Sequence, residues 1–97
     1  MSLEELVKHH RDQILSIASK YGASNIRVFG SVATGDTHSS SEIDLLVDLD
    51  PDRSLFDLGG LIYELNKVLG VDVDVVTPES LHWYIRDKVL EEAIEIK

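Results

Sequence analysis

The chain has 97 residues, of which 18 are acidic and 9 are basic, giving a formal net charge of −9. A chain of this length can close one modest core, which predicts a single domain over residues 1–97. A surface this negative repels nucleic-acid backbones, so general DNA or RNA binding is not expected, whereas a basic protein partner is compatible with it. The sequence has no cysteine, which excludes disulfides, thiolate metal sites and a thiol nucleophile.

No part of the chain has the composition of a membrane span or an export signal. No apolar run approaches the roughly 18 residues that a transmembrane helix needs. The N-terminal residues also lack a basic segment followed by an apolar one. We therefore expect a cytoplasmic protein without a membrane partner.

The first half of the chain predicts one helix and two strands. Ser2 begins a capping box, and apolar residues then recur at helical intervals, which predicts one helix as far as Gly22. Residues 26–29 form a short β-type run that ends at Gly30, a residue suited to a sharp turn. Residues 42–49 alternate in polarity, which is typical of a strand with one buried face. The predicted polar face of this strand carries Glu42, Asp44, Leu46 and Asp48.

A second long helix is predicted between residues 54 and 70. Ser54 is a suitable N-cap, and Gly70 is a suitable C-terminal stop. Gly59 and Gly60 lie inside this helix, where each costs about 1 kcal/mol relative to Ala. We therefore expect both glycines to allow close packing against a neighbouring element.

The C-terminal third predicts one more strand and one more helix. Residues 71–76 form the strand, with Asp72 and Asp74 on the same face. Thr77-Pro78 is a typical helix start, and the helix that follows has an apolar stripe of Leu81, Tyr84, Ile85, Val89 and Ala93. This order of elements predicts an α/β fold, a small mixed sheet of three or four strands backed on one side by helices, with the active face opposite.

Three carboxylates mark the predicted site. Glu42 and Asp44 are two positions apart on one strand, so their side chains project from the same face. If Asp74 lies at the same height on an adjacent strand, each charge pair repels by roughly 3 kcal/mol at about 5 Å and an effective dielectric constant of 20. A divalent cation relieves this repulsion, and Mg²⁺ prefers such oxygen ligands together with phosphate oxygens. Asp72 is the alternative third ligand.

A Gly-Ser pair follows the first predicted strand. Gly30 and Ser31 precede residues 32–34, a segment short enough for one helical turn. Backbone N–H groups and the Ser31 hydroxyl would then point toward an anion such as a β- or γ-phosphate. The glycine turn and the acidic pair are each weak signals, but their order and spacing together are specific.

In this order the motifs resemble the minimal nucleotidyltransferases of the DNA polymerase β-like superfamily. The matching segments are GSVATG at residues 30–35, SEIDLLV at residues 41–47 and VDVVTPESL at residues 73–81. The resemblance covers nearly the whole chain. It implies the nucleotidyltransferase fold, which is similar to the palm of polymerase β.

The resemblance also implies a reaction and a partner. The reaction is a two-metal transfer of a nucleotidyl group, usually adenylyl from ATP, to an acceptor hydroxyl with release of pyrophosphate. Glu42 and Asp44 would bind both Mg²⁺ ions, Asp74 would complete the catalytic metal site and help remove the acceptor proton, and Gly30 and Ser31 would hold the leaving phosphates. Members of this subfamily are typically encoded beside a HEPN-domain ribonuclease toxin and act as its antitoxin, some by adenylylating a toxin tyrosine. The implied partner is a HEPN-type toxin, in a homo- or hetero-oligomer.

Two positions depart from the commonest minimal form. That form has Asp at the position of Glu42 and often Arg at the position of Thr34, for which Arg27 and Arg53 are the nearest substitutes in the sequence. These departures and the charge of −9 favour an alternative, a catalytically weak or inactive binding module that neutralises a basic toxin by complex formation. Transfer to a small molecule is a third interpretation, for which so short a chain leaves little room.

Two further side-chain groups have open roles. His38 lies between the phosphate cradle and the carboxylates, where solvation competes with a contact to phosphate or base. Trp83 and Tyr84 lie in the region of the last predicted helix, and for Tyr84 we expect core packing, with a partner-binding anchor as the alternative.

Overall fold

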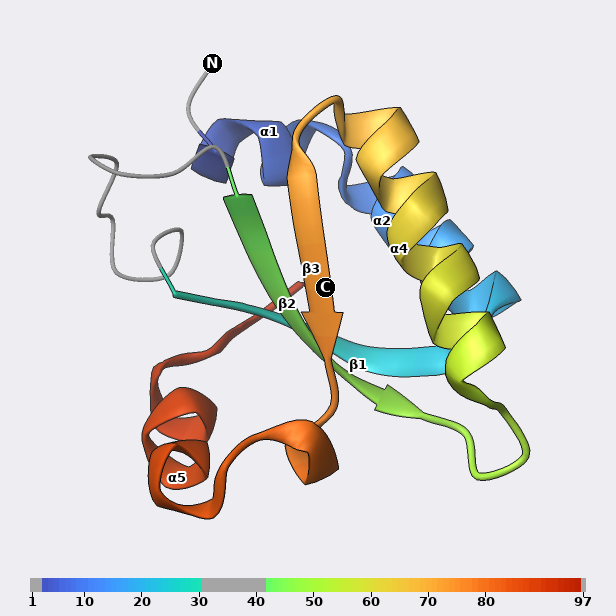
Figure 1. Cartoon of the computed structure of the whole chain (residues 1–97). Coiled ribbons are helices and arrows are strands. Elements are labelled where there is room, and N and C mark those ends of the chain that lie inside the picture. Colours follow the sequence, from blue (N-terminus) through green and yellow to red (C-terminus); the bar gives the residue numbers. More distant parts are fainter. Residues whose placement is uncertain (1–2, 31–41, 97) are drawn as a thin grey trace.

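The computed structural model describes residues 3–30 and 42–96 and is organised around one mixed sheet (Figure 1). The strands lie in the order β3-β2-β1-β4. β1 (Ala23–Phe29) is antiparallel to both β2 (Glu42–Leu49) and β4 (Ile94–Glu95), whereas β3 (Asp72–Val76) is parallel to β2. The predicted small mixed α/β sheet is therefore confirmed.

The helices lie mainly on one side of this sheet. Near the N-terminus are α1 (Leu3–His9) and α2 (Arg11–Lys20), followed later by α4 (Leu55–Leu69), the short 3-10 helix η1 (Pro78–Ser80) and α5 (Trp83–Glu92). α2 packs on β1 and α4 packs on β3, and the two helices lie side by side, while α5 lies on the other side of the sheet (Figure 1). Among the described residues, no helix combines the length and apolar character needed to cross a membrane.

The core forms between α2, α4 and the inner face of the sheet. Ile43, Leu45 and Val47 alternate along β2 and are buried against residues such as Leu61 and Leu65 of α4. This alternation confirms the prediction of a strand over residues 42–49.

Leu46 differs from the prediction that placed it on an open polar face. It lies on the face opposite the core residues, yet it is fully buried. Its register partner on β3 is Val76, after which the chain enters η1, and η1 contacts β2. We attribute the burial of Leu46 to this covering segment. The outer face of β2 is therefore covered at Leu46, the next residue after Asp44 on that face.

The N-terminal helix is divided, whereas a single helix was predicted as far as Gly22. α1 and α2 are separated at His10, whose φ of −103° and ψ of 18° are not helical. The His10 Nδ1 atom lies 3.0 Å from the carbonyl oxygen of Leu6. A side chain that bonds the local backbone competes with helix continuation, and apolar spacing does not report this. The predicted capping residue Ser2 lies outside the described residues.

β1 is longer than the predicted run of residues 26–29. It begins at Ala23, and its pairing with β2 is irregular between Ser24 and Arg27. Asn25 has a φ of 52°, which is unusual for a residue other than glycine. This bulge breaks the alternation of polarity, so the sequence pattern showed only the regular half of the strand.

The predicted ends of the second long helix are confirmed for α4. The Ser54 hydroxyl oxygen accepts a hydrogen bond from the Phe56 N–H at 3.2 Å, and Asp57 accepts one from the Ser54 N–H at 3.0 Å. The helix ends at Gly70, which has a φ of +70°. Capping bonds stabilise a helix by about 1 kcal/mol each, so these residues explain where α4 starts and stops.

The two glycines inside α4 differ in their surroundings. A Cβ atom added to Gly60 would lie 2.6 Å from the Cε1 atom of Tyr21, so close packing explains this glycine. Nothing lies within 4 Å of a Cβ atom added to Gly59, so for that position the packing explanation is wrong.

We predict opposite effects of alanine at these two positions. Gly59→Ala should raise the free energy of unfolding by about 1 kcal/mol, because alanine favours the helix and has open space there. Gly60→Ala should lower it by about 1–3 kcal/mol, because the new methyl displaces Tyr21, whose hydroxyl donates to Glu64 at 2.6 Å. Urea unfolding of both variants checks this, and equal effects at the two positions would contradict the packing difference.

The C-terminal region differs most from the prediction. Thr77-Pro78 starts a 3-10 turn, and α5 follows only at Trp83. No residue of α5 is buried, and Tyr84 is 66% exposed, so core packing of Tyr84 is wrong. The two-residue strand β4 was not predicted because so short a segment has no periodicity. It is held beside β1, where the Ile96 N–H donates to the Ile26 carbonyl at 2.8 Å.

Candidate functional site

The predicted carboxylates meet because β2 and β3 are adjacent and parallel. Asp44 is in register with Asp74, and Glu42 is in register with Asp72. Glu42, Asp44 and Asp74 each offer a carboxylate oxygen, and these three oxygens lie within 4.8 Å of one another. We call this group the acidic trio. Asp72 is not part of it.

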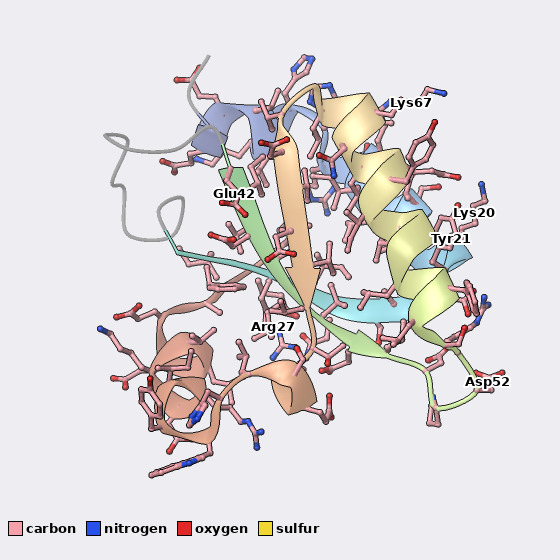
Figure 2. All side chains as sticks on the ribbon, viewed as in Figure 1. Lys20, Tyr21, Arg27, Glu42, Asp52 and Lys67 are labelled. Atoms are coloured by element: carbon pink, nitrogen blue, oxygen red, sulfur yellow. The ribbon has the colours of Figure 1, made fainter. Side chains whose placement is uncertain are left out.

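The trio lies on the sheet face opposite the core. Glu42 is the first residue of β2, and its side chain lies at the end of the sheet where this strand begins (Figure 2). Glu42 and Asp74 are exposed, whereas Asp44 is partly buried. Residues on this face alternate with the buried Ile43 and Leu45, so the two-residue period of the strand separates the site from the core.

Gly30 closes the site from the side of β1. It follows Phe29, which is in register with Asp44, and it has a φ of +73°. A Cβ atom added to Gly30 would lie 2.6 Å from the Oδ2 atom of Asp44. The absence of a side chain at Gly30 therefore lets the Asp44 carboxylate lie against the turn.

Three residues with predicted or open roles lie outside the described residues. They are Ser31, Thr34 and His38. The phosphate contact of Ser31 and any contact of His38 stay predictions. The roles of the acidic trio and Gly30 in binding metal and nucleotide are also predictions, although their positions are now known.

The electrostatics of the trio suit a bound cation. Burial first, and then the neighbouring charges of Glu42 and Asp74, raise the pKa of Asp44 from its ordinary value of 3.8 to about 6. Repulsion among carboxylates is relieved when a cation binds between them. The available donors are all carboxylate oxygens, which are the ligands of hard divalent ions such as Mg²⁺.

Arg27 and Arg53 could supply the positive charge that the commonest minimal form often has at the position of Thr34. Neither side chain is directed at the trio. The Arg27 Nη2 atom pairs with Asp48 at 3.0 Å, and its Nε–H donates to the Asn25 carbonyl. Arg53 pairs with Asp57 at 3.2 Å, and its side chain packs against Gly22. Both guanidinium groups therefore neutralise carboxylates outside the trio.

Phe29 was not predicted as a residue of the site. Its register with Asp44 makes it the cross-strand neighbour of that carboxylate, and directly opposed side chains on one face of a sheet contact each other. Phe29 therefore lies beside Asp44 on the face of the sheet that carries the trio. Its place immediately before the glycine turn was the only signal in the sequence.

Comparison with known proteins agrees with this fold. The chain belongs to the nucleotidyltransferase domain family, which matches residues 10–96. Among its relatives is MJ0435 of Methanocaldococcus jannaschii, described as a candidate protein adenylyltransferase, with 40% identity over 84 residues that cover 87% of this chain and 90% of that protein. The protein adenylyltransferase MntA of Thermococcus cleftensis is 31% identical over 94 residues, covering 97% of this chain and 92% of that protein.

Solved structures show the same fold. A candidate minimal nucleotidyltransferase superposes with a TM-score of 0.84 at 40% identity, covering 97% of this chain and 95% of the other. A toxin-antitoxin structure with AMP-PNP superposes with a TM-score of 0.74 at 22% identity, covering 90% of this chain and 72% of the other. The predicted membership of the minimal nucleotidyltransferases, and their fold, are confirmed.

Proposed function

We propose that the chain transfers AMP from ATP to a hydroxyl group of a HEPN-type toxin and thereby acts as its antitoxin. The observation that carries this proposal is the acidic trio beside the Gly30 turn. The relatives MJ0435 and MntA are named for protein adenylylation, and solved toxin-antitoxin complexes of MntA with HepT share the fold. These names support both the reaction and the class of partner.

The proposed reaction uses two Mg²⁺ ions, and the donor set fits them. Glu42 and Asp44 would bind both ions, and Asp74 would bind one. Bound Mg²⁺ supplies neutralisation of the phosphate charge and a lower pKa for the acceptor hydroxyl. The raised pKa of Asp44, caused by burial and then by the two adjacent carboxylates, is consistent with a site built for cations.

The residues of the chain bind the substrate and move one proton. Backbone N–H groups at the Gly30 turn hold the leaving phosphates, and Phe29 excludes water from one side of Asp44. The acceptor oxygen forms a bond to the α-phosphorus while the bond from that phosphorus to the β-phosphate oxygen breaks. Pyrophosphate leaves with the electron pair of that bond, and Asp74 accepts the proton of the acceptor hydroxyl.

The test is transfer to the product of the gene next to that of this chain, which the proposal expects to be a HEPN-type protein. Wild-type chain with ATP and Mg²⁺ should add one adenylyl group to that protein, measured by intact mass spectrometry, and EDTA should abolish the addition. Asp74→Asn should slow the transfer by at least about 100-fold, because it removes the proposed proton acceptor and a metal ligand. The matched control is Asp72→Asn, on the same face of β3 but outside the trio, which should keep nearly full activity.

A second candidate function is neutralisation by binding alone. It is favoured by the net charge of −9, by Glu42 in place of Asp, and by the engagement of Arg27 and Arg53 elsewhere. In that case the partner would stay unmodified in the same assay. Wild type and an Asp44→Asn variant would then bind the partner equally tightly in isothermal titration calorimetry.

A further inference from the structure

Three adjacent aromatic side chains lie on the surface where α5 begins. Trp83 is 77% exposed and Tyr84 is 66% exposed. The ring centroids of His82 and Tyr84 are 4.3 Å apart, and those of Trp83 and Tyr84 are 5.9 Å apart. We call His82, Trp83 and Tyr84 the aromatic cluster. Its rings pack on one another instead of on the core.

The helix that carries this cluster has little support within the chain. α5 has ten residues and none of them is buried. A helix of this length is marginal in water without a packed face. Exposed Trp and Tyr side chains are also the residue types that contribute most to binding energy at protein interfaces. The cluster therefore has the properties of a surface that another protein covers.

The segment that carries the cluster borders the face with the acidic trio. The chain leaves β3 at Val76, two residues after Asp74, and passes through η1 into α5. η1 contacts β2, and Leu46, the next residue after Asp44 on that face, is buried. η1 and the trio therefore lie on the same face of the sheet, and α5 follows η1 on the side away from α2 and α4 (Figure 1).

The negative charge around the cluster indicates which kind of partner fits it. Residues 77–96 contain five acidic and two basic side chains. One of the two basic residues, Arg86, is partly buried and donates to the Leu81 carbonyl at 3.2 Å. A basic surface complements this segment, whereas a second copy of a chain with a net charge of −9 would oppose like charges. The exposed acids of the segment are Glu79, Asp87, Glu91, Glu92 and Glu95.

We propose that the aromatic cluster is the docking surface for the protein that accepts the adenylyl group, through an apolar pocket ringed by basic side chains. The inference rests on the proposed function, because it identifies the occupant as the acceptor. Binding at the cluster holds the acceptor on the side of the sheet where the trio lies. Loss of the cluster should therefore weaken the binding of the acceptor and leave the chemistry of transfer unchanged.

The experiment compares two pairs of exposed aromatic residues. Trp83→Ser with Tyr84→Ser removes the cluster, and the matched control is Phe56→Ser with Tyr63→Ser on α4, where the native side chains are 90% and 65% exposed. The probe is the product of the gene next to that of this chain, the proposed HEPN-type partner, titrated without ATP so that no transfer is needed. The cluster variant should raise the dissociation constant by at least about 30-fold, and the control should leave it within about twofold.

A direct reporter of the contact is available in the same titration. Trp83 is the only tryptophan of the chain, so labelling with 5-fluorotryptophan gives one ¹⁹F resonance. That resonance should shift or broaden when the unlabelled partner is added, and the affinity should weaken as salt is raised. An unchanged resonance, no binding by wild type, or loss of affinity in the control pair alone would overturn the docking surface.

The outcomes also separate this inference from the proposed function. A partner that binds through the cluster but receives no adenylyl group contradicts the transfer and leaves the docking surface in place. A partner that the cluster variant adenylylates with unchanged KM and kcat contradicts the docking surface alone. Sedimentation velocity tests the remaining occupant, which is a second copy of this chain. If the wild type is a dimer and the cluster variant is a monomer, the surface belongs to the second copy and the proposal is overturned.

Discussion

Asp44→Asn is expected to abolish adenylyl transfer while making the metal-free protein more stable. Transfer should fall by at least about 1000-fold, because asparagine keeps the shape of the side chain but loses the charge that binds both cations. Without metal, the same change removes a partly buried carboxylate that is repelled by Glu42 and Asp74. A residue that costs stability for the sake of function is expected at an active site.

The raised pKa of Asp44 determines the pH range in which the metal-free variant is more stable than the wild type. The pKa of Asp44 is raised from 3.8 to about 6 in the folded state, first by burial and then by its two acidic neighbours. The folded state therefore binds this proton more tightly than the unfolded state does. The metal-free wild type should lose stability as the pH rises from about 4 to about 6 and stay at the lower value above that range. Below about pH 4 the advantage of Asp44→Asn should disappear.

Urea unfolding in EDTA across this pH range measures the effect. Above about pH 6 the variant should exceed wild type by about 1–2 kcal/mol, a value reduced for the solvent screening of a partly exposed group. Asp72→Asn is the control, since Asp72 is exposed and outside the trio, and should change stability by less than about 0.5 kcal/mol. Excess Mg²⁺ should stabilise wild type and not Asp44→Asn. Parallel pH curves for the two proteins would contradict the proposed repulsion.

Gly30→Ala is expected to lower transfer by at least about 100-fold, because the new methyl group displaces the Asp44 carboxylate. The Cβ atom would lie 2.6 Å from the Oδ2 atom of Asp44, which is closer than real Cβ contacts allow. The backbone also has a φ of +73°, which costs a residue with a side chain about 1–2 kcal/mol. Both the activity and the Mg²⁺-dependent gain in stability should be lost.

Gly70→Ala separates the two causes. Gly70 has almost the same φ, +70°, but a Cβ atom there would meet nothing within 4 Å. It should therefore show a similar loss of stability by urea unfolding and normal transfer by mass spectrometry. A Gly30→Ala variant as active as Gly70→Ala would show that the contact with Asp44 is unimportant.

The prediction of the site from the sequence depended on a local rule. Alternation along residues 42–49 was enough to put Glu42 and Asp44 on one strand face, because the two-residue period is a property of every strand. The choice of Asp74 over Asp72 came from the family resemblance. In the structure, Asp74 joins the trio because it is in register with Asp44, and a shift by one residue would have turned its side chain to the other face.

A helix was correctly predicted in the region of α5, but the expected core packing of Tyr84 was wrong, because periodicity reports an apolar stripe and not what covers it. Leu81, Tyr84 and Ile85 have helical spacing, and the structure exposes Tyr84 and leaves the whole helix without a buried residue. The break at His10 and the pairing of β4 were missed for a related reason. Each depends on a few individual hydrogen bonds and not on a repeated pattern.

By itself the sequence determined the local features of this protein: the strand faces, the capped ends of α4 and the glycine at the end of β1. These depend on neighbouring residues and on the steric limits of the backbone. Only the tertiary structure decided that Asp74 meets Asp44, that Gly30 touches the same carboxylate, and that Arg27 and Arg53 bind other acids. Such contacts join residues far apart in the chain, so they follow from which elements pair and in which register.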